Sequence, residues 1–242
     1  MLNEKIKTGL IFAIIAVIFL AINSYYLWLI IFLLASGIGY FEACKLFDTK
    51  NNYLILALGL ILGIYTQMPV VSMIFAILVL ASFLAYKQGD LKEILPFIYA
   101  GIGISFIFET YIRFELSGFI WLLLSVVLCD SFAYFVGKKY GKTSFSPSSP
   151  NKTLEGVIGG IIISTIISSI YAGFVYSEIG FLEVLFLSFL MAFFAVFGDL
   201  FESYLKRLAK VKDSGELFPG HGGVLDRVDA LIFASIIMVV FL

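Results

Sequence analysis

The sequence predicts an all-α integral membrane protein with about nine transmembrane helices and a cytoplasmic N-terminus. Of its 242 residues, 61% are hydrophobic and only 14% are charged, and the mean hydropathy is +1.05. A soluble domain of this length could not bury so much apolar surface. Apolar runs recur along almost the whole chain, and each is long enough to enter or cross a hydrocarbon core of about 30 Å as a helix.

The first four predicted helices cover residues 8–23, 25–43, 53–67 and 69–86. The first has no A-x-A-like cleavage site after it, so we expect a retained membrane helix rather than a cleaved signal peptide. The break between the third and fourth rests on Gln67-Met68-Pro69. Several predicted helices are shorter than the roughly 20 residues of a perpendicular span, which indicates shielding by neighbours or a thinned bilayer.

The remaining predicted helices cover residues 94–110, 117–137, 156–176, 181–205 and 227–242. Asp130 lies well inside the sixth, and a carboxylate there is either functional or held by a structural hydrogen bond. Gly156, Gly159 and Gly160 form a small-residue stripe on the seventh, which is typical of close helix packing.

The basic residues set the orientation. The chain has 16 Lys and Arg residues, and all except Arg113 fall at the N-terminus or after the second, fourth, sixth and eighth helices. Positive charge is retained on the cytoplasmic side during insertion. We therefore expect a multi-pass protein of the inner (cytoplasmic) membrane, with its polar loops and its site facing the cytoplasm.

Residues 1–242 are expected to form a single polytopic domain. Within it, residues 1–115 supply scaffold helices and a lipid groove, and residues 116–242 supply the catalytic helices and cytoplasmic loops. The longest polar stretch, about 138–155, leaves no room for a separate soluble domain. Cys44 and Cys129 show no metal-ligand spacing and are interpreted as small apolar residues.

Candidate functional residues concentrate between Gly198 and Asp229. At the end of the eighth helix, one face carries two carboxylates deeper in the membrane and three cations nearer the water: Asp199, Glu202, Ser203, Lys206, Arg207 and Lys210. Carboxylates inside a span are usually paired, metal-bound or in contact with a watery cavity. A metal-binding face and a buried ion pair with Lys206 both remain open.

A glycine-rich turn follows, and the last helix then begins with two more carboxylates. The turn contains His221, and its glycines allow the backbone to approach an anion closely. Asp226 and Asp229 lie three positions apart on one side of the helix. Carboxylates for Mg²⁺ and cations for phosphates suit a nucleoside triphosphate with its metal. The alternatives are a basic cluster that only signals topology and a structural His221.

The loop after the sixth helix is a second candidate region. Ser148, Ser149, Asn151, Lys152 and Thr153 offer hydroxyl, amide and ammonium donors for a phosphate or a base. A lone loop lysine is a weak signal by itself.

The segment from Ser203 to Asp229 resembles the signature of the phosphatidate cytidylyltransferases (CDP-diacylglycerol synthases). The matching positions, in the family's spacing, are Ser203, Lys206-Arg207, Lys212-Asp213, Pro219, His221-Gly222-Gly223 and Asp226-Arg227-x-Asp229. Upstream, Asp130 to Gly137, Ser149 to Thr153, Glu155-Gly156 and Gly159-Gly160 also match. The resemblance covers the C-terminal half in detail. The N-terminal half matches only in being hydrophobic and multi-helical, and Asn151, where many members carry Lys, is the mildest departure.

The resemblance implies an all-helical, metal-dependent nucleotidyltransferase. The implied partners are CTP, phosphatidic acid, membrane lipids and a second copy of the chain, with no nucleic acid. It implies Mg²⁺ as cofactor, and leaves open a second metal or a monovalent cation. The implied metal ligands are Asp199, Asp226, Asp229 and Asp130; the catalytic set is Asp199, Asp226, Asp229, Lys206, Arg207 and His221. The implied substrate-binding set is Ser149, Lys152, Ser203, Lys212, Asp213, Gly222, Gly223 and Arg227.

Two other functions compete with this interpretation. One is a related CTP-using enzyme with another lipid acceptor, such as an unsaturated ether lipid or a polyprenol. The other is a secondary transporter with Asp130, Asp199 and Glu202 on an ion path, although the sequence shows no inverted repeat to support it. The D-G-x-x-A-R pattern of CDP-alcohol phosphotransferases does not occur in the chain.

Overall fold

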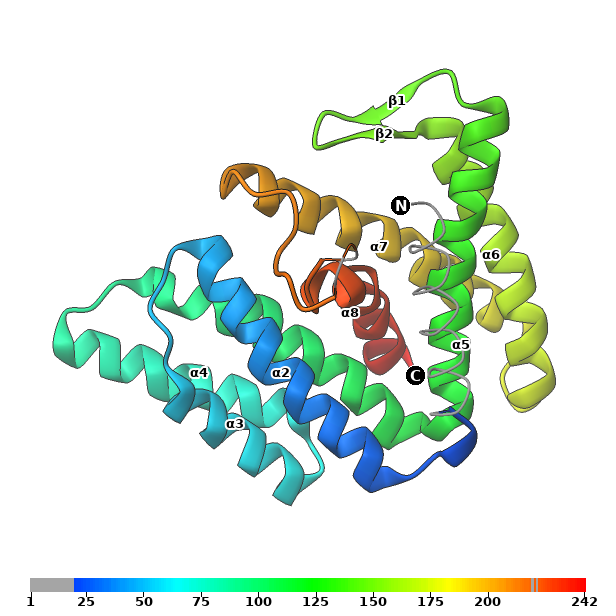
Figure 1. The fold of residues 1–242 in the computed structure, drawn as a ribbon. Helices are drawn as coiled ribbons and strands as arrows, with labels where there is room; N and C mark the ends of the chain where they lie inside the picture. Colours follow the sequence, from blue (N-terminus) through cyan, green and yellow to red (C-terminus); the bar gives the residue numbers. More distant parts are fainter. Residues whose placement is uncertain (1–19, 219, 221) are drawn as a thin grey trace.

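A computed structural model describes residues 20–218, 220 and 222–242, and these residues form a predominantly helical molecule (Figure 1). The helix expected at 8–23 lies almost entirely outside the described residues. His221 lies outside them as well. The helices pack around a core of buried apolar side chains that draws on every long helix from α2 to α8, whose bounds follow.

Three helices form the first part of the fold: α2 (Tyr25–Phe47), α3 (Tyr53–Thr66) and α4 (Pro69–Lys87). They match the predicted segments at 25–43, 53–67 and 69–86. The predicted break holds because Gln67 has a left-handed φ of 57° and Pro69 occupies the first position of α4.

The next helical run joins two predicted helices. A 3₁₀ turn, η1 (Leu91–Ile94), and a π-helical segment, η2 (Phe97–Ile102), lead into α5 (Gly103–Tyr140). The helices expected at 94–110 and 117–137 are therefore two arms of one run. They meet at Glu115, whose φ of 53° and ψ of −157° are not helical, and Figure 1 shows the arms running in different directions.

The polar stretch expected as a loop contains a β-hairpin, which is a departure from the all-helical prediction. Its strands, β1 (Ser144–Ser146) and β2 (Ser149–Thr153), pair antiparallel with Ser144 opposite Thr153. Thr153 then caps α6 (Leu154–Val175), accepting a hydrogen bond from the Gly156 amide at 3.2 Å. Short hydroxyl-rich strands have no apolar alternation, so the sequence pattern gave no strand signal.

Helix α6 packs closely against α5. A Cβ on Gly156 would lie 2.5 Å from the carbonyl oxygen of Ala133, and one on Gly160 would lie 2.5 Å from that of Cys129. The small-residue stripe therefore serves helix packing, as predicted. Two further helices complete the fold, α7 (Phe181–Leu208) and α8 (Leu225–Phe241). They match the predictions at 181–205 and 227–242, and each packs on the other and on α5.

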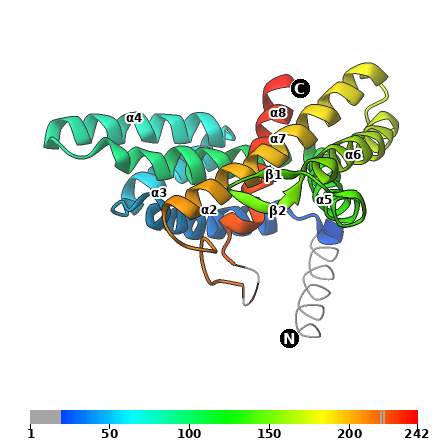
Figure 2. The same ribbon diagram turned by 90° about the horizontal axis from the view of Figure 1, so that it is seen from above.

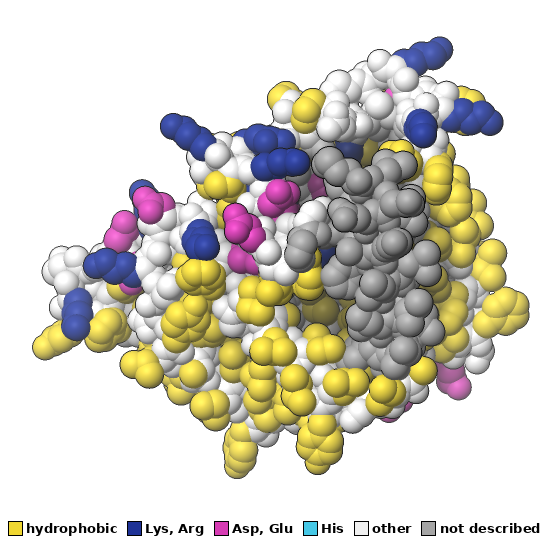
Figure 3. Space-filling model, viewed as in Figure 1, with side chains coloured by type: hydrophobic (Ala, Val, Ile, Leu, Met, Phe, Trp, Pro, Cys, Tyr) yellow, Lys and Arg dark blue, Asp and Glu magenta, His cyan; other side chains and the backbone are white. Residues whose placement is uncertain are grey.

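Within the described part of the chain, five helical stretches are long and apolar enough to cross a membrane: Tyr25–Phe47, Pro69–Lys87, Leu91–Tyr140, Leu154–Val175 and Phe181–Leu208. Figure 3 shows hydrophobic side chains over most of one face, with Lys and Arg gathered along its upper edge. The chain is thus a multi-pass, helical membrane protein. The count of nine helices and the cytoplasmic N-terminus remain predictions.

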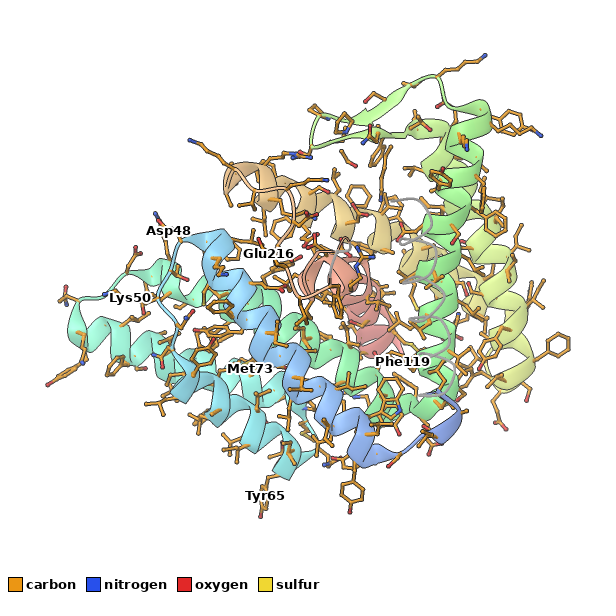
Figure 4. All side chains as sticks on the ribbon, viewed as in Figure 1. Asp48, Lys50, Tyr65, Met73, Phe119 and Glu216 are labelled. Atoms are coloured by element: carbon orange, nitrogen blue, oxygen red, sulfur yellow. The ribbon has the colours of Figure 1, made fainter. Side chains whose placement is uncertain are left out.

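The side-chain view separates the interior from the outer surface. Met73 is fully buried between helices, whereas Tyr65 is 87% exposed and points away from the bundle (Figure 4). Glu216, in the segment between α7 and α8, lies beside the end of α2 in the same view. That segment therefore runs from the end of α7 past α2 before it enters α8.

Candidate active site

A cavity lies where the β-hairpin, α5, α7 and α8 meet. It has a volume of about 570 Å³, and Figure 2 shows the hairpin beside α7 and the end of α5. Ten predicted site residues line it: Asp130, Ser149, Lys152, Asp199, Ser203, Lys206, Asp213, Asp226, Arg227 and Asp229. The structure thus brings the two separate candidate regions of the sequence into one site.

Lys152 connects the hairpin to two helices. Its Nζ donates a hydrogen bond to Asp199 Oδ2 on α7 at 2.8 Å and lies 3.7 Å from Asp130 Oδ1 on α5. Burial disfavours the charged lysine, yet the carboxylates of Asp199 and Asp130 outweigh burial and raise the pKa of Lys152 above its ordinary value. The lysine is therefore a fixed positive charge in this wall of the cavity.

Lys206 makes a second and more buried ion-pair group. Its Nζ donates to Glu202 Oε2 at 2.7 Å and to Asp226 Oδ1 at 2.5 Å. The Glu202 side chain is fully buried and that of Asp226 is 6% exposed. Of the two carboxylates on this face of α7, Glu202 therefore forms the buried ion pair with Lys206, whereas Asp199 pairs with Lys152.

The other oxygen of Asp226 is held by the segment between α7 and α8. Asp226 Oδ2 accepts hydrogen bonds from the Ser214 amide, the Ser214 hydroxyl and the Gly223 amide, each at 2.8 Å. With Lys206 on its first oxygen, Asp226 is the most heavily hydrogen-bonded carboxylate of the cavity wall. A carboxylate held at both oxygens has a fixed orientation.

Four predicted residues of the described chain lie outside this cavity wall: Arg207, Lys212, Gly222 and Gly223. Arg207 is exposed near the end of α7. Lys212 lines a separate cavity of about 520 Å³ together with Lys45 of α2. Their predicted roles toward phosphates remain predictions.

The two glycines before α8 do approach anions, and these anions belong to the protein. Gly222 has a left-handed φ of 80°, and a Cβ there would lie 2.4 Å from Asp226 Oδ2. A Cβ on Gly223 would lie 2.2 Å from Oε1 of Glu42, a residue of α2. Close approach to a carboxylate thus accounts for both glycines without a bound ligand.

Sequence reasoning missed Glu42. Its side chain is buried, with 3% of the residue exposed, and it contacts Ser214, Val224 and Leu225. A signal was available, because a carboxylate inside an apolar span is costly wherever it occurs. That rule was applied to Asp130 and to Asp199, and it applies equally to Glu42 in the predicted span at 25–43.

A second cavity adjoins the first. It has a volume of about 360 Å³ and shares five residues with the first cavity: Asp130, Asp199, Asp226, Arg227 and Asp229. Its remaining wall is mostly apolar, with Val126 and Val127 of α5 and Leu231 of α8. The carboxylates therefore lie between the cavity beside the hairpin and a second cavity among the helices, whose unshared wall is mostly apolar.

The charged side chains of the site suit the binding of an anion together with a cation. Five aspartates and four cations line the first cavity, and buried Glu202 adds a sixth carboxylate, so formal negative charge is in excess. Among the described residues, no three His, Cys, Asp or Glu side chains already converge as ligands of a metal ion. Such a site can bind a polyphosphate through its cations and a divalent ion through its spare carboxylate oxygens.

Comparisons with known proteins agree with this chemistry. The sequence pattern of the Cytidylyltransferase family matches residues 3–242. A phosphatidate cytidylyltransferase of Helicobacter pylori strain J99 is 41% identical over 99% of this chain and 91% of its own length. One from Bacillus subtilis is 30% identical over 96% of this chain and 94% of its own length. One from Thermotoga maritima is 43% identical over 57% of this chain and 53% of its own length.

Proposed function

The chain belongs to the cytidylyltransferase family, and from this premise we propose that it transfers the cytidylyl group of CTP to phosphatidic acid in the membrane. The products are CDP-diacylglycerol and pyrophosphate. The observation that carries the proposal is the shared cavity wall, in which aspartates of α5, α7 and α8 meet Lys152, Lys206 and Arg227 at the polar end of an apolar bundle. Relatives of nearly equal length carry the name of this activity.

The residues present fit a magnesium ion. Mg²⁺ takes hard oxygen ligands, keeps several waters, and is usually held by one or two carboxylates together with substrate phosphates. The cavity offers carboxylate oxygens and excess formal negative charge, and Asp130, Asp199 and Asp226 each lie within ion-pair distance of a lysine. By the family resemblance, Asp199 and Asp226 would hold the ion, supported by Asp130 and Asp229, with the triphosphate completing the ligands. When bound, Mg²⁺ would neutralise charge on the phosphates.

The protein's own groups position the two substrates. A phosphatidate oxygen forms a bond to the α-phosphorus of CTP while the bond from that phosphorus to the bridging oxygen breaks. Pyrophosphate leaves with the electron pair. Lys152, Lys206 and Arg227 would hold phosphate oxygens and stabilise the charge that develops on them. The phosphatidate phosphate is already an anion, so neither a covalent nucleophile nor a strong general base is required.

The two cavities suggest where each substrate binds. CTP fits the cavity beside the hairpin, where Ser149, Asn151 and Lys152 offer donors to its base and phosphates. The phosphatidate headgroup would enter from the second cavity, past the apolar wall at Val126, Val127 and Leu231, which keeps its acyl chains among the helices. The carboxylates shared by both cavities then lie where the two phosphates meet.

The remaining features of the proposal concern the cell and the assembly. The concentration of Lys and Arg at the cavity end of the bundle supports a site that faces the cytoplasm from the inner membrane (Figure 3). A homodimer is part of the proposal by family resemblance. A second metal or a monovalent cation is left open.

Pyrophosphate release by the purified protein tests the proposed function. We expect release in detergent only when CTP, phosphatidic acid and Mg²⁺ are all present, and no release with unsaturated ether-lipid phosphates or polyprenols as acceptor. Release with one of those acceptors instead would reassign the substrate within the family. Absence of release with every acceptor, from protein that unfolds cooperatively on heating, would contradict an enzymatic role and reopen the transport alternative.

A further inference from the structure

Glu42 is a buried carboxylate that the proposed chemistry does not use. It lies on α2, in the part of the chain expected to serve only as scaffold and lipid groove. Its Oε1 accepts a hydrogen bond from the Val224 amide at 3.0 Å, and its Oε2 accepts one from the Leu225 amide at 2.8 Å. These partners stand 182 and 183 residues away in sequence. The contact thus joins the two halves of the chain.

The charge of Glu42 is balanced by a helix end instead of a side-chain cation. Among the described residues, no Lys, Arg or His forms an ion pair with it. One amide belongs to Val224, the N-cap residue before α8, and the other to Leu225, the first residue of α8. At this end of a helix, backbone N–H groups have no partner within the helix and the helix dipole favours negative charge. Glu42 therefore caps α8 from another helix.

The segment between α7 and α8 is shaped around this carboxylate. A Cβ added to Gly215 or to Gly223 would lie 2.2 Å from Glu42 Oε1 in either case. Any larger residue at these positions would have to displace Glu42. The segment and the carboxylate consequently fix one another.

Ser214 extends the contact from Glu42 to Asp226. The Ser214 hydroxyl lies 3.1 Å from Glu42 Oε2 and 2.8 Å from Asp226 Oδ2. A hydroxyl has one hydrogen to donate, so the two carboxylates share it. The Gly223 amide, which also donates to Asp226 Oδ2, directly precedes the residue whose amide Glu42 holds. Glu42 thereby controls the donors that fix Asp226.

We propose that Glu42 is a positioning residue for Asp226. By capping α8 and holding Ser214, it turns Oδ1 of Asp226 toward Lys206 and the cavity while Oδ2 stays bound to the protein. This inference rests on the proposed function for the catalytic meaning of Asp226, but the geometric claim is independent of it. Groups that orient a metal ligand typically change metal affinity or activity by about 10- to 100-fold when they are removed.

The test compares Glu42→Gln with Glu109→Gln. Glu109 is the control because it is also buried and also holds a helix start, accepting a hydrogen bond from the Val70 amide at 3.0 Å, but it lines neither cavity of the candidate site. Unlike Glu42, it also pairs with a cation, Arg113. We expect Glu42→Gln to lower kcat and to raise the half-saturating Mg²⁺ concentration. The two effects combined should amount to about 10- to 100-fold. Glu109→Gln should lower thermal stability and leave the half-saturating Mg²⁺ concentration unchanged.

Hydrogen–deuterium exchange of residues 212–226 gives a readout that needs no turnover. Glu42→Gln should speed exchange in this segment, whereas Glu109→Gln should not. If Glu42→Gln does not fold, Ser214→Ala removes the bridge without touching the buried charge, and the same shift in Mg²⁺ dependence is expected from it. The inference is overturned if both variants keep the wild-type Mg²⁺ dependence and exchange. Wild-type protein without any turnover would contradict the proposed function instead, and the exchange comparison would still decide the role of Glu42.

Discussion

Lys206 stands between two buried carboxylates, and its replacement gives a quantitative test of the site's electrostatics. Lys206→Met keeps most of the side-chain volume and removes the charge that pairs with Glu202 at 2.7 Å and with Asp226 at 2.5 Å. Glu202 is fully buried and the Lys206 side chain is 14% exposed. The variant therefore leaves two carboxylates close together with no cation between them.

The magnitude follows from that burial. Removing one partner of a buried ion pair typically costs about 3–5 kcal/mol, because the other charge stays buried and unpaired. The partial exposure of Lys206 favours the lower end, about 3 kcal/mol. For a chain of this length each kcal/mol lowers the unfolding midpoint by about 2–4 °C, so we expect a loss of about 6–12 °C.

The assay is thermal unfolding in detergent, followed by intrinsic fluorescence at one scan rate, with EDTA present so that a metal ion cannot replace the lost charge. Lys210→Met is the control for removing a positive charge near the same helix end, because Lys210 is exposed. Adding Glu202→Gln to Lys206→Met should recover part of the loss. If Lys206→Met matches Lys210→Met and the double variant brings no recovery, Lys206 does not neutralise the carboxylates and the reasoning fails.

Two further predictions concern the hairpin and the contact between α7 and α8. Lys152→Ala should lower kcat/KM for CTP by about 10- to 100-fold, because a charged hydrogen bond contributes about 1.5–3 kcal/mol, while an unchanged kcat/KM would remove Lys152 from the site. Gly198→Ala should destabilise the protein by about 1–3 kcal/mol in thermal unfolding, because its Cβ would lie 2.5 Å from the carbonyl oxygen of Asp229. Gly180→Ala, with nothing within 4 Å of its Cβ, is the matched control, and equal midpoints for the two variants would contradict the close packing.

Much of the helical layout could be predicted because it depends on local signals. Apolar runs predict the membrane spans, and Pro69 sets the position of the break between the third and fourth predicted helices. The bend at Glu115 within one helical run was not predicted, because neither a glycine nor a proline stands at this position to indicate its positive φ. The β-hairpin was missed because Ser144–Ser146 and Ser149–Thr153 lack the apolar alternation of ordinary strands.

The sequence predicts which residues line the candidate site, but it does not predict which lysine pairs with which carboxylate. Asp130, Lys152, Asp199 and Asp226 were named from their residue types and spacing, and they do line one cavity. Which lysine pairs with which carboxylate depends on how the hairpin folds back over α7, and spacing within a helix carries no information about that. Of the ion pairs that the sequence leaves open for Lys206, the one with Glu202 on its own helix forms, whereas Asp199 pairs with Lys152, 47 residues away.

Glu42 marks the limit of motif-based reasoning. Its partners lie at the opposite end of the chain, so no local pattern connects it to Asp226. Of the two glycines that make room for it, the sequence singles out only Gly223, and there as a residue that approaches an anionic ligand. The physical requirement was the same, a backbone that approaches a carboxylate, and only the fold reveals whose carboxylate it is.

The most direct test of the account is the identity of the product formed from radiolabelled CTP and phosphatidic acid in liposomes. Wild-type protein with Mg²⁺ is expected to give labelled CDP-diacylglycerol and an equal amount of pyrophosphate. Asp226→Asn, which keeps the size of a side chain hydrogen-bonded at both oxygens, is expected to give neither, and EDTA should abolish the wild-type reaction reversibly. Full activity in Asp226→Asn, or product formation that persists in EDTA, would contradict a metal-assisted transfer at this site.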